Sequence, residues 1–122
     1  MNELVGIYKL LSDETRLRVI MLLQQEELCV CEICGVLDVS QPKVSKCLSK
    51  LRDLNLVEDT RKEKFVFYSL KKTHKVLNSN LNSILNSIDD FKIFALDQQR
   101  LIKKETYLDA CSIEALNKVS EV

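Results

Sequence analysis

The chain has 122 residues, with 18 acidic and 18 basic side chains and a formal net charge of zero. Hydrophobic residues make up 46% of it and charged residues 30%, an ordinary balance for a globular protein. This length excludes a separate catalytic module, so we expect residues 1–122 to form a single domain. No apolar run approaches the ~18 residues that span a bilayer, and the start lacks a signal-peptide pattern. We therefore expect a cytoplasmic protein without membrane contact, with its five cysteines in a reducing compartment.

Four helices are predicted in the first half of the chain. Apolar residues at helical spacing indicate one helix over the first dozen residues and a second that follows Ser12-Asp13, a suitable N-cap. A short third helix is expected over about 30–37. Ser40 is then placed to cap a fourth helix, which tolerates Pro42 in its first turn because that N–H would have no intrahelical partner.

The fourth helix has an apolar and a polar face. Its expected buried stripe is Val44, Leu48 and Leu51, and the side chains largely off the core are Gln41, Lys43, Ser45, Lys46, Ser49 and Lys50. Residues 41–64 contain seven basic and four acidic side chains, whereas residues 26–38 contain four acids and no base. A local basic segment is what phosphate contacts require, although a solvated helix face would have the same composition.

In the second half of the chain, the spacing of apolar residues first changes from a helical pattern to one typical of strands. Residues 56–61 and 64–70 are predicted as two strands joined by a charged turn near Lys62 and Glu63, a pair small enough to pack as a wing beside the helices. One long helix is then expected over about 74–103, with a coiled-coil-like seam of Leu77, Leu81, Ile84, Ile88, Phe91 and Ala95 that favours dimerisation. Residues 104–122 form a short tail, for which we expect a last short helix.

Three thiols lie within six residues, at Cys29, Cys31 and Cys34, immediately ahead of the fourth helix. Thiolates select soft or thiophilic ions. At ~100° per residue, Cys31 and Cys34 lie about 60° apart on one helix face and Cys29 points away from Cys31. An intact helix would therefore not bring the three sulfur atoms to one ion. Ligation is expected to unwind the start of this helix near Cys29 or to keep it from forming, which predicts a thiol-triggered switch of nucleic-acid binding.

Three sequence blocks carry a resemblance to a known family. They are Leu-Ser-Asp-x-x-Arg-Leu from Leu11, Glu-Leu-Cys-Val-Cys-Glu-Ile-Cys from Glu27, and Ser-Gln-Pro-Lys-Val-Ser-x-x-Leu-x-x-Leu from Ser40. With them, residues 11–70 resemble the arsenical-resistance repressor (ArsR) family of bacterial metalloregulators. The resemblance implies a mainly α winged helix-turn-helix with a small β-hairpin wing, dimerising through its terminal helices. It implies a DNA-binding transcriptional repressor rather than an enzyme.

The resemblance also implies an inducer. Family members that sense zinc through the last helix need paired histidines, and His74 is the only histidine here. Cadmium and lead sensors add cysteines near the N-terminus, and none precedes Cys29. The third thiol, Cys34, matches the branch that senses trivalent arsenic or antimony. The implied metal ligands are thus Cys29, Cys31 and Cys34, which would bind arsenic(III) or antimony(III) and release the operator.

For DNA, the resemblance implies two groups of contacts by a homodimer on double-stranded operator DNA. The first, at or near the major groove, is Gln41, Lys43, Ser45, Lys46 and Ser49. The second, on the flanking backbone or in the minor groove, is Arg61, Lys62 and Lys64 of the wing. Cys47 stands where the family often has histidine, and we interpret it as a packing residue, as we do Cys111. The wing turn lacks the glycine that is common in the family.

Several alternatives stay open. The cysteines could be plain buried small residues, or Cys31 and Cys34 could be a redox pair in a repressor that senses oxidants. A repressor of soft divalent ions such as cadmium or lead fits the same thiols. From another class, a small thiol-dependent reductase is opposed by the single histidine and the missing phosphate or oxyanion loop. A protein-interaction module would show no salt-dependent DNA binding.

Overall fold

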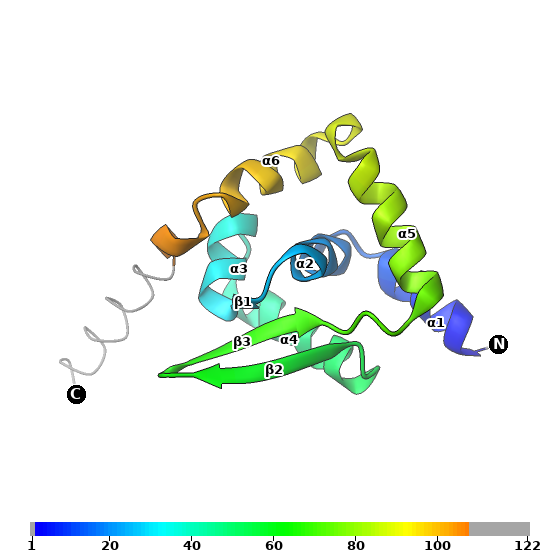
Figure 1. Ribbon diagram of the computed structural model, residues 1–122, viewed down its shortest axis with the longest axis horizontal. Helices are drawn as coiled ribbons and strands as arrows, with labels where there is room; N and C mark the ends of the chain where they lie inside the picture. Colours follow the sequence, from blue (N-terminus) through cyan, green and yellow to red (C-terminus); the bar gives the residue numbers. More distant parts are fainter. Residues whose placement is uncertain (1, 108–122) are drawn as a thin grey trace.

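The computed structural model describes residues 2–107, which form helices around a three-stranded sheet (Figure 1). The elements in chain order are α1 (Asn2–Leu11), α2 (Glu14–Gln25), β1 (Leu28–Cys29), α3 (Val30–Leu37), α4 (Gln41–Asp53), β2 (Val57–Lys62), β3 (Phe65–Leu70), α5 (Lys75–Asn86), the 3-10 turn η1 (Ile88–Asp90) and α6 (Lys92–Leu101). None of the helices within this part of the chain is both long and apolar enough to cross a membrane.

At the bend between α1 and α2, side chains hydrogen-bond the free backbone groups at the end of α1 and at the start of α2. Asp13 caps α2, as predicted, because its carboxylate accepts the backbone N–H of Arg16 at 2.9 Å. The Arg16 guanidinium turns back to α1 and donates to the carbonyls of Leu10 and Lys9, each at 3.2 Å. The last carbonyls of a helix have no intrahelical partner, so Arg16 replaces water there. The Leu-Ser-Asp-x-x-Arg-Leu block thus encodes a helix junction.

Helix α2 lies in the centre of the core, and α3 and α4 pack against it (Figure 1). Val19 and Ile20 of α2 have no exposed surface. Asp38 joins α3 to α4 in the left-handed conformation, with φ of 54°, which aspartate tolerates better than most residues. Val44, Leu48 and Leu51 are buried, which confirms the predicted stripe of α4, and Cys47 is buried beside them.

The sheet contains one strand more than the predicted hairpin. Its order is β1-β3-β2, with β2 and β3 paired antiparallel from Val57 opposite Leu70 to Lys62 opposite Phe65. The predicted strands are confirmed within two residues at each end. Glu63 takes a φ of 58° in the turn, the conformation that a glycine adopts without strain. The two-residue β1 was missed, because a strand this short has no alternating pattern of its own.

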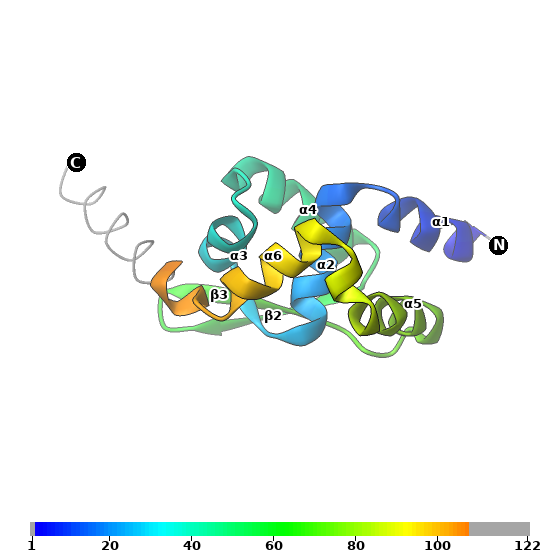
Figure 2. The same ribbon diagram turned by 90° about the horizontal axis from the view of Figure 1, so that it is seen from above.

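The prediction of one helix over about 74–103 is wrong, because that stretch folds as α5, η1 and α6. A straight helix of 30 residues would extend ~45 Å and carry its second half away from the core. Instead, Leu77 and Leu81 are fully buried, and Leu101 is 8% exposed in the same core. Figures 1 and 2 show α6 turned back across α2 and α3. Of the tail predicted over 104–122, residues 104–107 are helical, and residues 108–122 lie outside the described residues.

Helix, turn, helix and wing follow one another in the order that the sequence predicts, and the fold is mainly helical. This is the architecture of a winged helix-turn-helix, with α3 and α4 as the helix pair and β2–β3 as the wing. The fold class is therefore as predicted.

Candidate thiol site and nucleic-acid interface

Cys29 lies outside the helix that carries Cys31 and Cys34. Its backbone is extended (φ −89°, ψ 168°) and it is the N-cap of α3, while it also belongs to β1 opposite Phe67. The Glu32 carboxylate accepts the Cys29 backbone N–H at 3.1 Å, and both residues are 2% exposed. Helix α3 begins at Val30, as predicted, so Cys29 already lies outside the helix.

Cys31 and Cys34 lie on α3 itself and are both half-buried. Residues three apart occupy one side of a helix, as predicted. Within residues 2–107, however, no three Cys, His, Asp or Glu side chains lie close enough together to hold a metal ion. The structure therefore does not bring Cys29, Cys31 and Cys34 together as a ready-made site. The donors have the right chemistry for a soft ion, but one ion could bind all three only after a change of conformation.

Burial disfavours the thiolate form at two of these positions. Burial raises the pKa of Cys29, and this effect outweighs the lowering by the Glu32 backbone N–H. Burial also raises the pKa of Cys34. Because the thiolate is the nucleophile and the metal ligand, both thiols are protonated and slow to react near neutral pH. Reactivity at these positions depends on opening the surrounding structure.

The C-terminal end of α3 is held from two sides. Arg18 of α2 donates to both carboxylate oxygens of Asp97 in α6, at 2.9 and 2.8 Å, and to the carbonyl of Leu37 at 2.9 Å. Both charged side chains are buried. Gly35, two residues before Leu37, lies against the Tyr107 ring, so close that a Cβ added at Gly35 would stand 2.2 Å from a ring atom. Sequence patterns did not point to Arg18 or Asp97, since they are 79 residues apart.

The residues predicted to face DNA are all exposed. In α4 the exposed predicted side chains are Gln41, Lys43, Ser45, Lys46 and Ser49, and in the wing they are Arg61, Lys62 and Lys64. Lys62 is paired with Glu27, so part of its charge is compensated within the chain. The aromatic rings of Phe67 and Phe65 lie beneath Lys62 and Lys64, at 5.5 and 5.7 Å from the two nitrogens.

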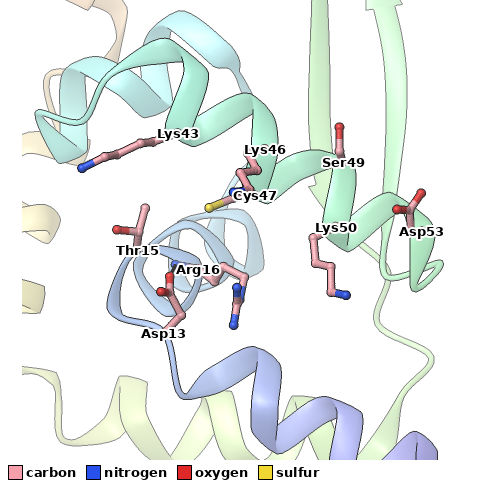
Figure 3. A pocket seen from close by; sticks show the side chains of 9 residues that line it. All are labelled: Asp13, Thr15, Arg16, Lys43, Lys46, Cys47, Ser49, Lys50 and Asp53. Carbon is pink, nitrogen blue, oxygen red and sulfur yellow. Dashed lines mark hydrogen bonds between the residues drawn. The ribbon is translucent and has the colours of Figure 1, made fainter.

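A hollow of about 650 Å³ lies between the start of α2 and the outer face of α4 (Figure 3). In Figure 3, Thr15 and Asp13 of the α2 start lie across from Lys43 and Lys46. Its charged lining consists of four basic and two acidic side chains, which are Arg16, Lys43, Lys46, Lys50, Asp13 and Asp53. An excess of positive charge in a concave surface attracts anions such as phosphate. The sequence predicted the α4 residues Lys43, Lys46 and Ser49 as DNA-facing, and they line this hollow. It did not point to Thr15, which lines the opposite side.

Comparisons with known proteins agree with this architecture. Residues 13–59 match the family model described as bacterial regulatory protein, arsR family. The arsenical resistance operon repressor of Escherichia coli is 46% identical over 67 residues, which cover 54% of this chain and 57% of that protein. The cadmium resistance transcriptional regulatory protein CadC of Listeria innocua is 39% identical over 74 residues, 60% of this chain and 61% of that protein. The chain thus spans just over half the length of these two relatives.

Two further proteins are covered more completely. The transcriptional repressor SdpR of Bacillus subtilis is 32% identical over 84 residues, which cover 69% of this chain and 91% of that protein. The crystal structure of the transcriptional repressor BigR from Xylella fastidiosa superposes with a TM-score of 0.62 at 30% identity, covering 70% of this chain and 85% of that chain. These relatives are transcriptional regulators rather than enzymes, in agreement with the prediction.

Proposed function

The chain belongs to the ArsR family of bacterial regulatory proteins, and from this premise we propose that it is a transcriptional repressor released from operator DNA by a trivalent metalloid. The observation that supports this most directly is the position of the thiols. Cys29 caps α3 and Cys31 and Cys34 lie within it, while α3 leads through a single turn into α4. A change at the thiols therefore acts on the helix pair that would read DNA.

Arsenite and antimonite fit the donor set. Three thiols can replace the three hydroxyl groups of arsenous acid, so that three As–S bonds form, three As–O bonds break and three waters leave. Arsenic stays trivalent, and no oxidant or reductant is needed. Three soft donors within six residues suit a thiophilic ion, whereas zinc usually takes a fourth ligand. The relative from Escherichia coli, an arsenical resistance operon repressor, supports the same inducer class.

Binding to double-stranded DNA is proposed to use α4 and the wing together. Gln41, Ser45 and Ser49 are exposed on α4 and can hydrogen-bond base edges in the major groove, while Lys43 and Lys46 neutralise phosphates. The hollow in Figure 3 is placed to receive backbone phosphate between the α2 start and α4. On the wing, Arg61, Lys62 and Lys64 would reach the flanking backbone.

A homodimer is proposed to form through the terminal helices. Helix α1 exposes three apolar side chains, Leu4 (41%), Val5 (45%) and Tyr8 (51%). Further along, three more apolar side chains are exposed, Phe91 (46%) just before α6, Leu96 (39%) within it and Ile102 (85%) just after it. The predicted seam contributes less, because Leu77 and Leu81 are buried within the same chain. A two-fold dimer predicts operator half-sites ~34 Å apart or a multiple of that spacing.

The test is fluorescence anisotropy of the reduced protein on DNA from upstream of its own gene, titrated with arsenite and, separately, with cadmium. We expect arsenite to release the DNA, and Cys29→Ser, Cys31→Ser and Cys34→Ser each to bind DNA but resist release. Cys47→Ala is the matched control, because it removes a buried thiol outside the cluster and should keep the response.

Other outcomes would contradict parts of this proposal. Equal release of the three serine variants by arsenite would refute the ligand set. Release by cadmium or by an oxidant but not by arsenite would instead support a soft-metal or redox sensor, a reading that the CadC relative also favours. Consumption of arsenate with an added reductant would indicate a reductase. Absence of any salt-dependent DNA binding would refute the regulatory function itself.

A further inference from the structure

The segment that carries Cys29 also attaches the wing to the helices. Strand β1 pairs with β3, with Leu28 opposite Tyr68 and Cys29 opposite Phe67. Strand β2 lies on the other side of β3, so β1 is the edge through which the start of α3 is joined to the wing, while β3 and β2 also pack against α2 and α4. Glu27, immediately before β1, forms an ion pair with Lys62 at the end of β2. Residues 27–29 therefore hold the wing through both backbone and side chain.

The two ends of α3 are held by different contacts. At the C-terminal end, the Leu37 carbonyl accepts from Arg18, which is itself bound to the buried Asp97 carboxylate. At the N-terminal end, the Glu32 carboxylate accepts the Cys29 N–H, and Leu28 and Cys29 pair with β3. Movement of Cys29 therefore acts first on the N-terminal end, which is the end next to the wing.

We propose that β1 transmits thiol ligation to the wing. A cysteine side chain has a single rotatable bond between Cα and Sγ, so Cys29, buried and extended in β1, reaches the α3 face of Cys31 and Cys34 only if its backbone moves. That movement separates Cys29 from Phe67 and loosens the β1 edge of the wing, which shifts its basic side chains relative to α4, while β3 stays packed against α2. Glu32 is the positioning residue that holds β1 in place in the metalloid-free protein. The inference rests on the proposed function, since it needs one inducer bound by all three thiols.

Hydrogen exchange followed by NMR can detect this movement directly. In a strand paired on both sides, backbone N–H groups point alternately to the two neighbours, so β3 carries amides that face β1 and amides that face β2. On adding arsenite to the reduced wild-type protein, we expect exchange of the β1-facing amides to rise by about tenfold or more. The β2-facing amides serve as the internal control, because the hairpin itself should stay paired. Cys29→Ser should show neither change.

The outcomes separate this inference from the proposed function. Release of DNA by arsenite with unchanged protection of the β1-facing amides would refute transmission through β1 and leave the repressor proposal standing. Equal loss of protection at both sets of amides would also refute it, since the whole wing would then unfold. Failure of arsenite to release DNA would refute the proposed function, and the inference would fall with it.

A second experiment needs no inducer. Glu32→Ala removes the acceptor for the Cys29 N–H, whereas Glu32→Gln keeps an oxygen acceptor at the same place and is the matched control. In the metalloid-free protein, we expect Glu32→Ala alone to speed exchange of the β1-facing amides and to weaken DNA binding, with circular dichroism confirming the fold. Faster exchange with unchanged DNA affinity would refute the coupling. Slow exchange in Glu32→Ala would refute the role of Glu32.

Discussion

Replacing Asp97 with asparagine would leave a buried guanidinium without its counterion. The Arg18 and Asp97 side chains are 9% and 3% exposed, and two hydrogen bonds of 2.9 and 2.8 Å join them. The hydrogen bond to Asp97 is the main cause that raises the pKa of Arg18. Arginine remains charged at neutral pH even without that partner. The variant therefore keeps a buried positive charge that the native protein had paired.

Removing one partner of a buried ion pair costs ~3–5 kcal/mol, which is a large part of the ~5–15 kcal/mol that stabilises a typical domain. We expect Asp97→Asn to lower the free energy of unfolding by that amount. Asp90→Asn is the matched control, since Asp90 is exposed and surface changes usually stay within ~0.5 kcal/mol. The double variant Arg18→Met/Asp97→Leu removes both charges, and it should be more stable than Asp97→Asn.

Urea denaturation of the four proteins at one protein concentration measures these differences, because oligomerisation makes apparent stability depend on concentration. Circular dichroism would follow the helices. A change below ~1 kcal/mol for Asp97→Asn would refute the argument, since it would mean that water or another group compensates Arg18. A double variant no more stable than Asp97→Asn would contradict the view that the unpaired charge causes the loss.

Three further predictions concern packing, thiol reactivity and DNA binding. Gly35→Ala should destabilise the protein by ~1–3 kcal/mol in thermal unfolding, because the new methyl group would overlap the Tyr107 ring, and Gly6→Ala, in open space, should not. Burial raises the pKa of Cys34, so iodoacetamide should alkylate Cys34 more slowly in the folded protein than in the denatured chain at pH 7, as followed by mass spectrometry. The alkylation rate of the folded protein should keep rising above pH 9, where the rate of the denatured chain levels off. Equal rates would contradict the burial argument. Lys43→Ala should reduce the slope of log affinity against log salt by ~1.8, which is ~0.9 for each protomer of the proposed dimer, and an unchanged slope would remove Lys43 from the phosphate contacts.

The sequence determined the elements whose signals are local. Asp13 followed by an apolar helical period fixes the start of α2, and the spacing of Val44, Leu48 and Leu51 fixes which side of α4 is buried. The exposed positions of Lys43 and Ser45 follow from the same spacing. Each of these depends on neighbours within one or two turns, which is why they are visible without coordinates.

The thiol site was only partly predictable. The sequence identified Cys29, Cys31 and Cys34 and the start of α3 at residue 30, but it gave no indication of strand β1. In the structure Cys29 is held in β1 by its pairing with Phe67, a residue 38 positions away by sequence number. Pairing across that separation leaves no local pattern, so the need for Cys29 to leave a sheet became apparent only from the fold.

The path of the C-terminal half was likewise decided by tertiary structure. The seam from Leu77 to Ala95 has the same period whether it packs against a second chain or against its own core. Burial of Leu77 against α2 and the ion pair between Arg18 and Asp97 selected a bent pair of helices over a straight one. By itself, the sequence determined which residues are apolar, basic or thiol-bearing and on which side of each helix they lie. Only the three-dimensional packing decided their partners, because burial free energy depends on surfaces that meet across long stretches of chain.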